Sequence, residues 1–343
     1  MSATATETKT ETNRWIALLV LCTGFLMIVL DATVVNVALP SIQDDLGFAP
    51  SSLAWVVNAY LIAFGGLLLL AGRLGDLISR RGMFLSGLVV FTLASLACGA
   101  AQSQEMLIGA RFVQGVGGAM TSSVILGMIF TMFPEPREQA KAMGVFSFVA
   151  SGGGSVGLIA GGVLTDLINW HWIFFINIPI GIATAVFALR YVAADRGAGF
   201  GQGADALGAI LSTAALMLLV YTIVQPAAHD GWGASTTLLC GAGAIALGVA
   251  FVVREATAAK PLIPLRIFRV REVAASNAIQ GLAVAGMFGT FFMGSLYLER
   301  ILGYTPLEIG LAFLPLTLVM GVVSLRYSER LIMRFGPRRT LVP

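Results

Sequence analysis

Long apolar runs fill this chain, and they limit its possible folds more than any other feature of the sequence. A helix that crosses a membrane needs about 20 mainly apolar residues, and about ten runs come close to or exceed that length. Backbone groups in lipid must form hydrogen bonds internally, so runs this long favour helices. Strands of a membrane barrel would be shorter and would alternate in polarity. The predicted spans are residues 15–39, 53–72, 83–101, 106–132, 142–165, 172–192, 205–225, 236–253, 273–298 and 307–325.

The composition supports a membrane protein and argues against an oily water-soluble enzyme. Of the 343 residues, 57% are hydrophobic and 11% are charged, whereas a soluble domain carries about a quarter charged residues. A water-soluble core of this size could not hide so much apolar sequence. We therefore predict an all-α polytopic membrane protein.

The chain begins with a polar segment, residues 1–14, which we expect to be disordered. The apolar run that follows is too long for the h-region of a cleaved signal peptide. We therefore expect the first run to be a retained anchor.

The cysteines and histidines give no sign of a metal site or a disulfide framework. Cys22, Cys98 and Cys240 lie far apart within apolar runs and form no CxxC pair. His171 and His229 fall in connections between spans, without neighbouring ligands. No catalytic triad or nucleotide-binding motif is present. We predict no metal, no cofactor and no enzymatic activity.

Basic residues gather in alternate connections between the predicted spans, and the other connections hold only Arg300. The positive-inside rule therefore places the basic connections and the N-terminus in the cytoplasm. We expect the chain to be a multi-pass protein of the cell (inner) membrane. Because these residues are divided among loops, no nucleic-acid-binding patch is expected. The set comprises Arg73, Arg80, Arg81, Arg137, Lys141, Arg190, Arg196, Arg254, Lys260, Arg266, Arg269, Arg271, Arg326, Arg330, Arg334, Arg338 and Arg339.

Two ionisable residues lie inside apolar runs: Asp31 in FLMIVLDATVVNVALP and Arg111 in MLIGARFVQGVGGAM. An intramembrane charge is costly, and its default interpretation is functional. Gln114 follows Arg111 at an offset of three, on the same face of a helix. We predict that Asp31 gains and loses a proton while Arg111 and Gln114 tune it. The alternative is a structural ion pair with no role in mechanism.

The fifth run contains a row of glycines in SGGGSVGLIAGGVL. Gly153, Gly157 and Gly161 recur every four residues, and Gly162 follows. Small residues at this spacing let two membrane helices approach closely. A phosphate-binding loop is excluded, because it would need a Lys-Ser/Thr ending and a preceding strand. Plain packing without a mechanistic role remains the alternative.

Several of these segments together resemble the major facilitator superfamily, and in particular its fourteen-span drug:proton antiporter branch. The resemblance covers residues 15–340, and six segments carry it in the order that the family shows. They are LDATVVNVALP, GRLGDLISRR, LIGARFVQGVGGA, GSVGLIAGG, NWHWIFFINIPIG and YLERILGYTPLEIGLAFLP.

The resemblance implies a two-halved helical bundle with a central site that opens alternately to each side. It implies a six-helix N-terminal bundle at 15–192 and two linker helices within 193–255. A partial C-terminal bundle would then occupy 256–343.

The resemblance also implies a cytoplasmic latch that favours the outward-open state. The glycine matching Gly72 permits a close helix contact. The acid matching Asp76 caps a helix of the other half, where the helix dipole favours an anion. The arginines matching Arg80 and Arg81 complete the charge network. The alternative is that these charges only fix orientation.

The chain departs from the family pattern in several ways. Leu77 and Ser79 replace a basic residue and a glycine, which puts part of the latch in doubt. Leu158 replaces a proline, so a helix kink is expected to be weaker. About ten spans are visible where the branch has fourteen. The chain is therefore either a C-terminal truncation or part of a longer product.

These features predict a proton-coupled secondary transporter that exports small amphipathic compounds or drugs. Its partners would be protons, a small-molecule substrate and the lipid bilayer. We expect Asn36, Trp55, Asn58 and Tyr60 to line the substrate cavity, because aromatic faces suit flat or cationic molecules. Two alternatives stay open: an exporter of one specific metabolite, and a non-transporting fragment or subunit-like partner.

Overall fold

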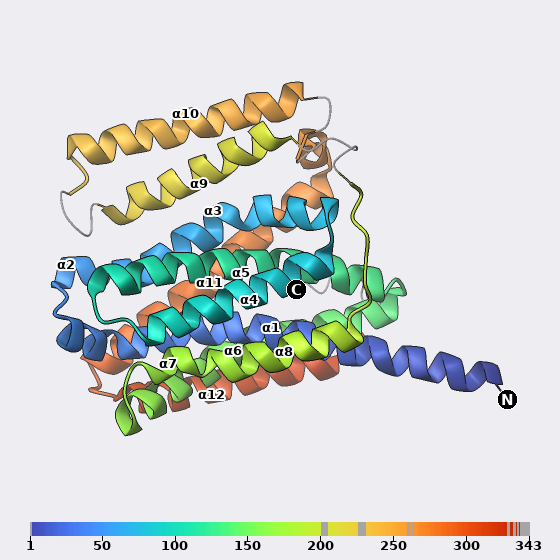
Figure 1. The fold of residues 1–343 in the computed structure, drawn as a ribbon, viewed down its shortest axis with the longest axis horizontal. Coiled ribbons are helices and arrows are strands. Elements are labelled where there is room, and N and C mark those ends of the chain that lie inside the picture. Colours follow the sequence, from blue (N-terminus) through green and yellow to red (C-terminus); the bar gives the residue numbers. More distant parts are fainter. Residues whose placement is uncertain are drawn as a thin grey trace.

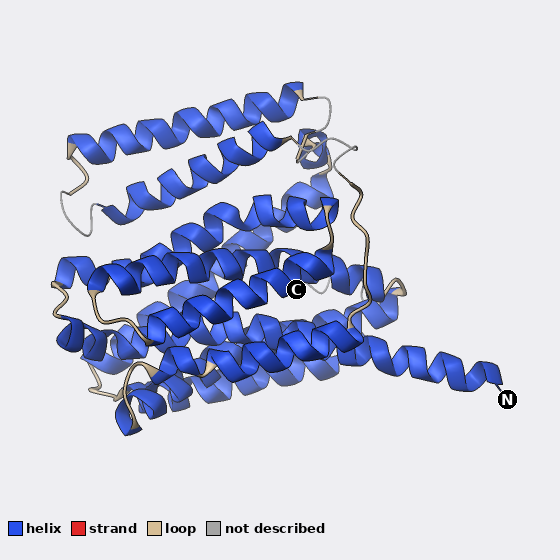
Figure 2. Cartoon of the chain, in the orientation of Figure 1, coloured by secondary structure: helices blue, strands red, loops and turns tan. Residues whose placement is uncertain are grey.

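Long helices running alongside one another make up the computed structural model of this chain (Figures 1 and 2). The structure describes residues 2–199, 205–225, 231–258, 261–262, 264–327, 330–331, 334 and 336, and these contain no strand. The predicted all-α fold is confirmed. The helices are α1 (Ser2–Leu46), α2 (Pro50–Leu53), α3 (Trp55–Leu77), α4 (Arg80–Gly99), α5 (Gln104–Met132), α6 (Pro136–Leu167), α7 (Trp172–Phe175), α8 (Asn177–Tyr191), α9 (Ala206–Gln225), α10 (Ser235–Thr257), η3 (Leu265–Arg269), α11 (Arg271–Arg300), α12 (Pro306–Val322) and η4 (Val323–Tyr327).

Each predicted span lies largely on one helix, except 172–192, which covers α7 and α8, and 307–325, which covers α12 and the start of η4. Among the described residues, 7 helical segments are long and apolar enough to cross a membrane. Leu207–Ile223 and Leu307–Val322 are shorter apolar helices, and α11 covers the ninth predicted run. The chain is thus a multi-pass membrane protein.

The N-terminal segment differs from the prediction of disorder. Residues from Ser2 onward form the first turns of α1, which project beyond the other helices in Figure 1. The segment contains Ala, Glu and Lys, which favour helices. Extending a helix that is already formed also avoids the cost of nucleation.

Helix packing divides the first part of the chain into two neighbouring sets. Helix α5 packs against α3 and α4, while α1 packs against α6 and α8. Contacts between α4 and α8, and between α1 and α5, join the two sets. Helices α9 and α10 pack against each other, and α9 covers α3, as Figure 1 shows at the top of the view. Helix α12 packs on α6.

The glycine row on α6 faces α1 at close range. A methyl group on Gly157 would lie 1.8 Å from the hydroxyl oxygen of Thr33, and one on Gly161 would lie 3.0 Å from the backbone of Val34. A methyl group on Gly153 would also crowd α1 side chains, at 2.9 Å. The backbones of α1 and α6 can approach this closely because these three positions lack a side chain.

The last glycine of the predicted set has a different neighbour. A methyl group on Gly162 would meet Leu307 of α12 at an ordinary van der Waals distance of 3.6 Å. Leu158 lies within α6, which is one unbroken helix from Pro136 to Leu167.

Two apolar clusters lie at opposite ends of the bundle, and polar side chains lie between them. On α1, the first cluster includes buried residues within 17–28 and the second includes buried residues within 34–42. Asp31 falls between these stretches. On α5, Arg111 likewise falls between Leu107 of the second cluster and 124–129 of the first. The candidate site is therefore enclosed by apolar layers on both sides.

Candidate functional site

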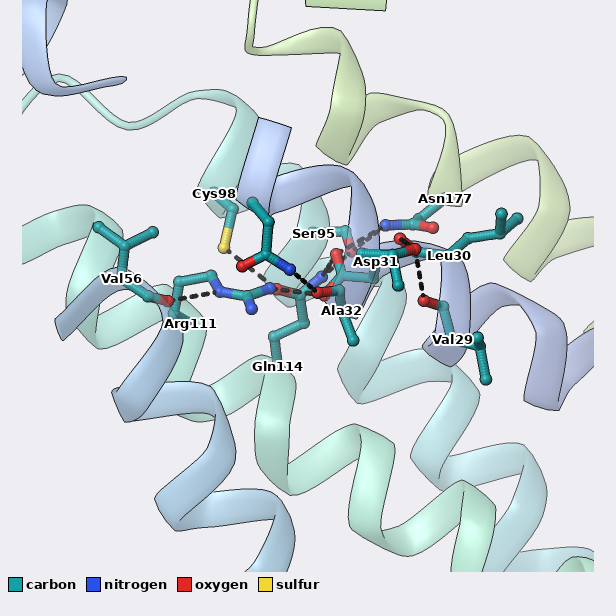
Figure 3. A network of polar contacts seen from close by, with 12 residues as sticks. Val29, Leu30, Asp31, Ala32, Val56, Ser95, Cys98, Arg111, Gln114 and Asn177 are labelled. Atoms are coloured by element: carbon teal, nitrogen blue, oxygen red, sulfur yellow. Dashed lines mark hydrogen bonds and ion pairs between the residues drawn. The ribbon is translucent and has the colours of Figure 1, made fainter. Parts of the chain in front are cut away.

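Asp31 and Arg111 meet in the interior of the bundle, as Figure 3 shows. Their side chains are 0% and 1% exposed, and Arg111 Nη1 lies 2.5 Å from Asp31 Oδ2. Arg111 Nε donates to the backbone carbonyl of Val56 on α3 at 2.9 Å. The ion pair, together with the bond to Val56, therefore joins α1, α3 and α5.

Gln114 completes the predicted group. Its Nε2 donates to Asp31 Oδ1 at 2.7 Å and to Ser95 Oγ at 2.7 Å. Its Oε1 accepts from Arg111 Nη1 at 2.6 Å and faces the thiol of Cys98 at 3.6 Å. Both ends of this amide are occupied, because Gln114 lies one helical turn after Arg111 on the same face of α5.

Asn177 on α8 and Ser95 on α4 belong to the same network, and the sequence analysis missed both. Asn177 Nδ2 donates to Asp31 Oδ1 at 3.1 Å and to Ser95 Oγ at 3.3 Å. The helix restarts at Asn177 after Ile176, which separates α7 from α8. Pro179 fits this first turn, where a backbone N–H has no partner in its own helix. The signal that was overlooked is an amide within the apolar stretch IFFINIPIG.

Two aromatic rings enclose the guanidinium group. The Arg111 Cζ atom lies 4.4 Å from the ring centre of Tyr60 and 5.7 Å from that of Phe174. These distances suit cation–π contacts, which are strongest where water is excluded. Tyr60, predicted to line a substrate cavity, is 2% exposed and packs on the guanidinium group of Arg111.

The network can stabilise an ionised carboxylate and can also respond to its loss. Asp31 accepts hydrogen bonds from Arg111, Gln114 and Asn177, and hydrogen bonds to the charged form favour that form. Removing one partner of a buried ion pair leaves an uncompensated charge, which costs about 3–5 kcal/mol. Protonation of Asp31 would therefore weaken the contacts that hold α1, α5 and α8 together at this level.

The other predicted substrate residues do not gather in one place. Asn36 is exposed, and its side chain donates to the backbone of its own helix at 3.1 Å. Trp55 packs on Tyr221 of α9, with ring centres 5.7 Å apart. Asn58 is half-buried on α3.

A cavity of about 570 Å³ lies elsewhere, between the ion pair and the α3–α4 turn. Its wall is mainly apolar and contains three aromatic rings, together with the side chains of Arg73 and Asp76. Two of the rings, Phe25 and Phe146, have centres 4.7 Å apart. The lining residues are Phe25, Phe64, Leu68, Leu69, Gly72, Arg73, Asp76, Ser122, Ser123, Leu126, Phe146 and Leu262.

The predicted latch residues form a network within the first half of the chain. Arg80 Nε donates to Asp76 Oδ1 at 2.8 Å. Arg80 Nη1 donates to the Gly127 carbonyl at 3.1 Å and to Thr131 Oγ1 at 3.0 Å. The α3–α4 turn is thereby fastened to α5. The helix of the other half that Asp76 was expected to cap is not among the described contacts.

Arg81, the other latch arginine, links α4 to α8. Its Nη2 donates to the Leu189 carbonyl near the end of α8, at 2.6 Å.

Gly72 has more space around it than Gly75. A methyl group on Gly72 would fit at 3.6 Å from the nearest atom, whereas one on Gly75 would lie 2.4 Å from Val124. The resemblance implied a close helix contact at Gly72, and the closest approach of α3 to α5 in this region lies at Gly75, about one helical turn later.

Asp195 is a third residue that the sequence analysis missed. It lies in the connection between α8 and α9 and accepts from the Ser79 hydroxyl at 2.7 Å, and from the backbone N–H groups of Arg80 at 2.7 Å and Arg81 at 3.0 Å. Ser79 in turn caps α4, because its Oγ accepts from the N–H of Gly82. Partial burial raises the pKa of Asp195, but these hydrogen bonds outweigh that effect and hold the pKa below its ordinary value.

The following residues fasten this connection to the α3–α4 turn through the backbone. The N–H groups of Gly197, Ala198 and Gly199 donate to the carbonyls of Ile78, Asp76 and Leu77 at 2.8–2.9 Å. A methyl group on Gly197 would lie 2.2 Å from the Leu77 carbonyl oxygen. Figure 1 places this strap, residues 193–199, at the same end of the bundle as the N-terminus.

Sequence comparisons identify relatives that match most of the chain. The family description Major Facilitator Superfamily matches residues 21–343. The "Puromycin resistance protein pur8" of Streptomyces alboniger is 40% identical over 332 residues, which are 97% of this chain and 65% of the relative. The "Cephamycin export protein CmcT" of Amycolatopsis lactamdurans is 42% identical over 343 residues, which are 99% of this chain and 70% of the relative.

Solved structures share the fold at low sequence identity. The human organic anion transporter MFSD10 and the proton:xylose symporter XylE each give a TM-score of 0.59 with 14% identity. The similarity covers 93% and 96% of this chain, and 73% and 70% of the two solved chains, respectively. This chain therefore spans 65–73% of the length of these four proteins.

Proposed function

The chain belongs to the major facilitator superfamily, and from this premise we propose that it is a proton-coupled exporter of small amphipathic compounds. It is a transporter and not an enzyme. The proton would bind at Asp31, and alternating access of the bundle would carry the substrate outward.

The buried Asp31–Arg111–Gln114 network is the observation that carries this proposal. A carboxylate that is 0% exposed and faces a guanidinium group changes its interactions strongly when it is protonated. Neutral Asp31 would release Arg111 and allow α1 and α5 to adopt a second arrangement. Ions and ligands shift such equilibria when they bind one arrangement more tightly than the other.

The cargo class rests on the cavity and on the relatives. The cavity combines aromatic rings with the carboxylate of Asp76, a combination that suits amphipathic and cationic molecules. The names of the relatives refer to puromycin resistance and cephamycin export. The same names favour a second candidate function, the export of one specific antibiotic metabolite. A broad range of transported compounds would favour the first candidate, and a single compound the second.

The orientation and the organisation into halves complete the proposal. The N-terminus and the α3–α4 turn would lie in the cytoplasm, as the distribution of basic residues favours. Residues 15–192 would form one bundle, the linker helices would lie within 193–255, and 256–343 would belong to the second half. Asp76, Arg80 and Arg81 would act as the cytoplasmic latch.

Everted membrane vesicles containing the chain provide the test. We expect a proton gradient to drive ethidium accumulation, and we expect Asp31→Asn to abolish it while membrane insertion is unchanged. Asp44→Asn is the matched control, because Asp44 lies on the same helix and is exposed. Gradient-driven accumulation at the normal rate in Asp31→Asn would contradict the assignment.

A further inference from the structure

The two side-chain amides that contact Asp31 differ in how many of their polar atoms have a hydrogen-bond partner. Gln114 has partners on both its nitrogen and its oxygen. Asn177 is 0% exposed and donates through Nδ2, but its Oδ1 has no hydrogen-bond partner among the described residues. A buried acceptor without a partner is costly and calls for an explanation.

The oxygen without a partner, Asn177 Oδ1, belongs to the same amide group whose nitrogen donates to Asp31. A half-turn of the Asn177 amide about its χ2 torsion exchanges the positions of Nδ2 and Oδ1, and this torsion has a broad two-fold preference. Gln114 cannot turn in this way without losing its bonds to Asp31 and Arg111. Asn177 is thus the amide that can change its hydrogen bonds at Asp31 while Gln114 keeps its own hydrogen bonds.

We propose that Asn177 is a positioning residue that satisfies Asp31 in both of its protonation states. When Asp31 is ionised, Asn177 Nδ2 donates to Asp31 Oδ1, as in Figure 3. When Asp31 is protonated, the amide turns and its Oδ1 accepts the hydrogen bond of the new carboxylic acid group. The inference rests on the proposed function, in which Asp31 takes up and releases a proton.

The proton balance is simple. A hydronium ion transfers one proton to Asp31 Oδ1 and leaves water, and release of the proton to water reverses the step. Oδ1 keeps a lone pair that continues to accept from Gln114 Nε2 while its new O–H donates to Asn177. Arg111 stays charged throughout.

Few other groups can compete for this proton. In the described part of the chain, the titratable or charged side chains that face Asp31 are Arg111 from α5, Tyr60 from α3 and Cys98 from α4. From α8, the side chain that faces Asp31 is Asn177, and an amide does not titrate.

The test reads the protonation of Asp31 directly and needs no substrate. Infrared difference spectra of the purified 343-residue protein are recorded between about pH 4 and pH 10, the range open to a buried carboxyl group. The carbonyl stretch of the protonated acid is assigned by its loss in Asp31→Asn. In Asn177→Leu, which keeps the approximate shape and removes both polar atoms, we expect two changes. The band moves to higher frequency, and the titration midpoint rises by about one pH unit, because the ionised form loses the stronger hydrogen bond.

The controls separate this role from simple packing. Asn177→Ser supplies a hydroxyl that both donates and accepts, so both quantities should return toward the wild-type values. Thr184→Val removes another buried hydroxyl from α8, which is bonded only within its own helix, and should change neither quantity. If Asn177→Leu does not insert into membranes, Asn177→Ser is compared with wild type. It should then show smaller shifts in the same directions, because a hydroxyl is shorter than the amide.

Two failures can be told apart. If the wild-type protein shows no band that depends on Asp31, the proposed function fails. If that band titrates but keeps its frequency and midpoint in Asn177→Leu, the role of Asn177 is overturned while the proposed function stands.

Discussion

Two carboxylates organise different parts of this molecule, and each accepts three hydrogen bonds. Asp31 is fully buried, and its donors are side chains from α5 and α8. Asp195 is exposed in a connection, and two of its three donors are backbone N–H groups in the first turn of α4. One carboxylate is held by movable side chains between apolar layers, and the other caps a fixed helix end.

The same number of hydrogen bonds has different consequences at the two carboxylates, because the donors differ. Side-chain donors on different helices can separate when the carboxylate changes its charge, so Asp31 links protonation to helix packing. Backbone donors at a helix end cannot separate without unwinding the helix. Asp195 therefore stabilises one local arrangement, in which the strap at 193–199 lies against the α3–α4 turn.

The largest expected effect comes from breaking the buried site. Arg111→Leu should destabilise the protein by about 3–5 kcal/mol, because it leaves Asp31 buried without its cation. Unfolding in detergent solution measures this loss. Arg190→Leu, at an exposed position on α8, should change stability by less than about 0.5 kcal/mol. Similar losses in the two variants would contradict the account, and Asp31→Asn added to Arg111→Leu should recover part of the stability.

The next effect concerns the strap and should be more local. Gly197→Ala places a methyl group 2.2 Å from the Leu77 carbonyl, so the backbone must shift, at a cost of about 1–3 kcal/mol. Hydrogen exchange of the amides of 76–82 should become faster, while exchange near Asp31 stays the same. Gly233→Ala is the control, because a methyl group there meets nothing within 4 Å. Unchanged exchange in Gly197→Ala would show that the strap does not hold the turn.

A smaller effect is expected when the charge of Asp195 is removed. Asp195→Asn keeps the size of the side chain but weakens its bonds to the first turn of α4, which should cost about 1 kcal/mol. Exchange of the Arg80 and Arg81 amides measures this change. The account predicts that proton-driven transport survives in Asp195→Asn and is lost in Asp31→Asn. Loss of transport in both variants would remove the distinction between the two carboxylates.

The smallest expected effect is a change with pH at the same turn. The pKa of Asp195 is lower in the folded protein than its ordinary value. Its contribution to stability is therefore fully present above the unfolded-state pKa of about 3.9, and is lost as the pH falls through the lower folded-state pKa. After correction for the intrinsic pH dependence of exchange, protection of the Arg80 and Arg81 amides should weaken only below about pH 4. Weakening that begins near neutral pH would point to another group.

The sequence predicted the features that follow from long apolar runs and from ionisable residues within those runs. Apolar runs of membrane-spanning length determined the helices, and an ionisable residue within such a run identified Asp31 and Arg111. Asn177 was missed because uncharged polar residues are common in membrane helices, and its partner Asp31 lies 146 positions away. The contact of Trp55 with Tyr221 was not predicted, because the position of α9 could not be derived from the sequence. Asp195 belongs to no motif, and only the folded strap brings it to α4.

Proton movement measured together with substrate movement is the most direct test of the central claim. Proteoliposomes containing the chain and a trapped pH-sensitive dye are given a substrate gradient, with ethidium as the probe. The account predicts that wild-type protein moves protons in the direction opposite to ethidium, and that Asp31→Asn moves none. Proton movement of equal size in Asp31→Asn, or wild-type ethidium transport without proton movement, would contradict the assignment of Asp31 as the proton-binding site.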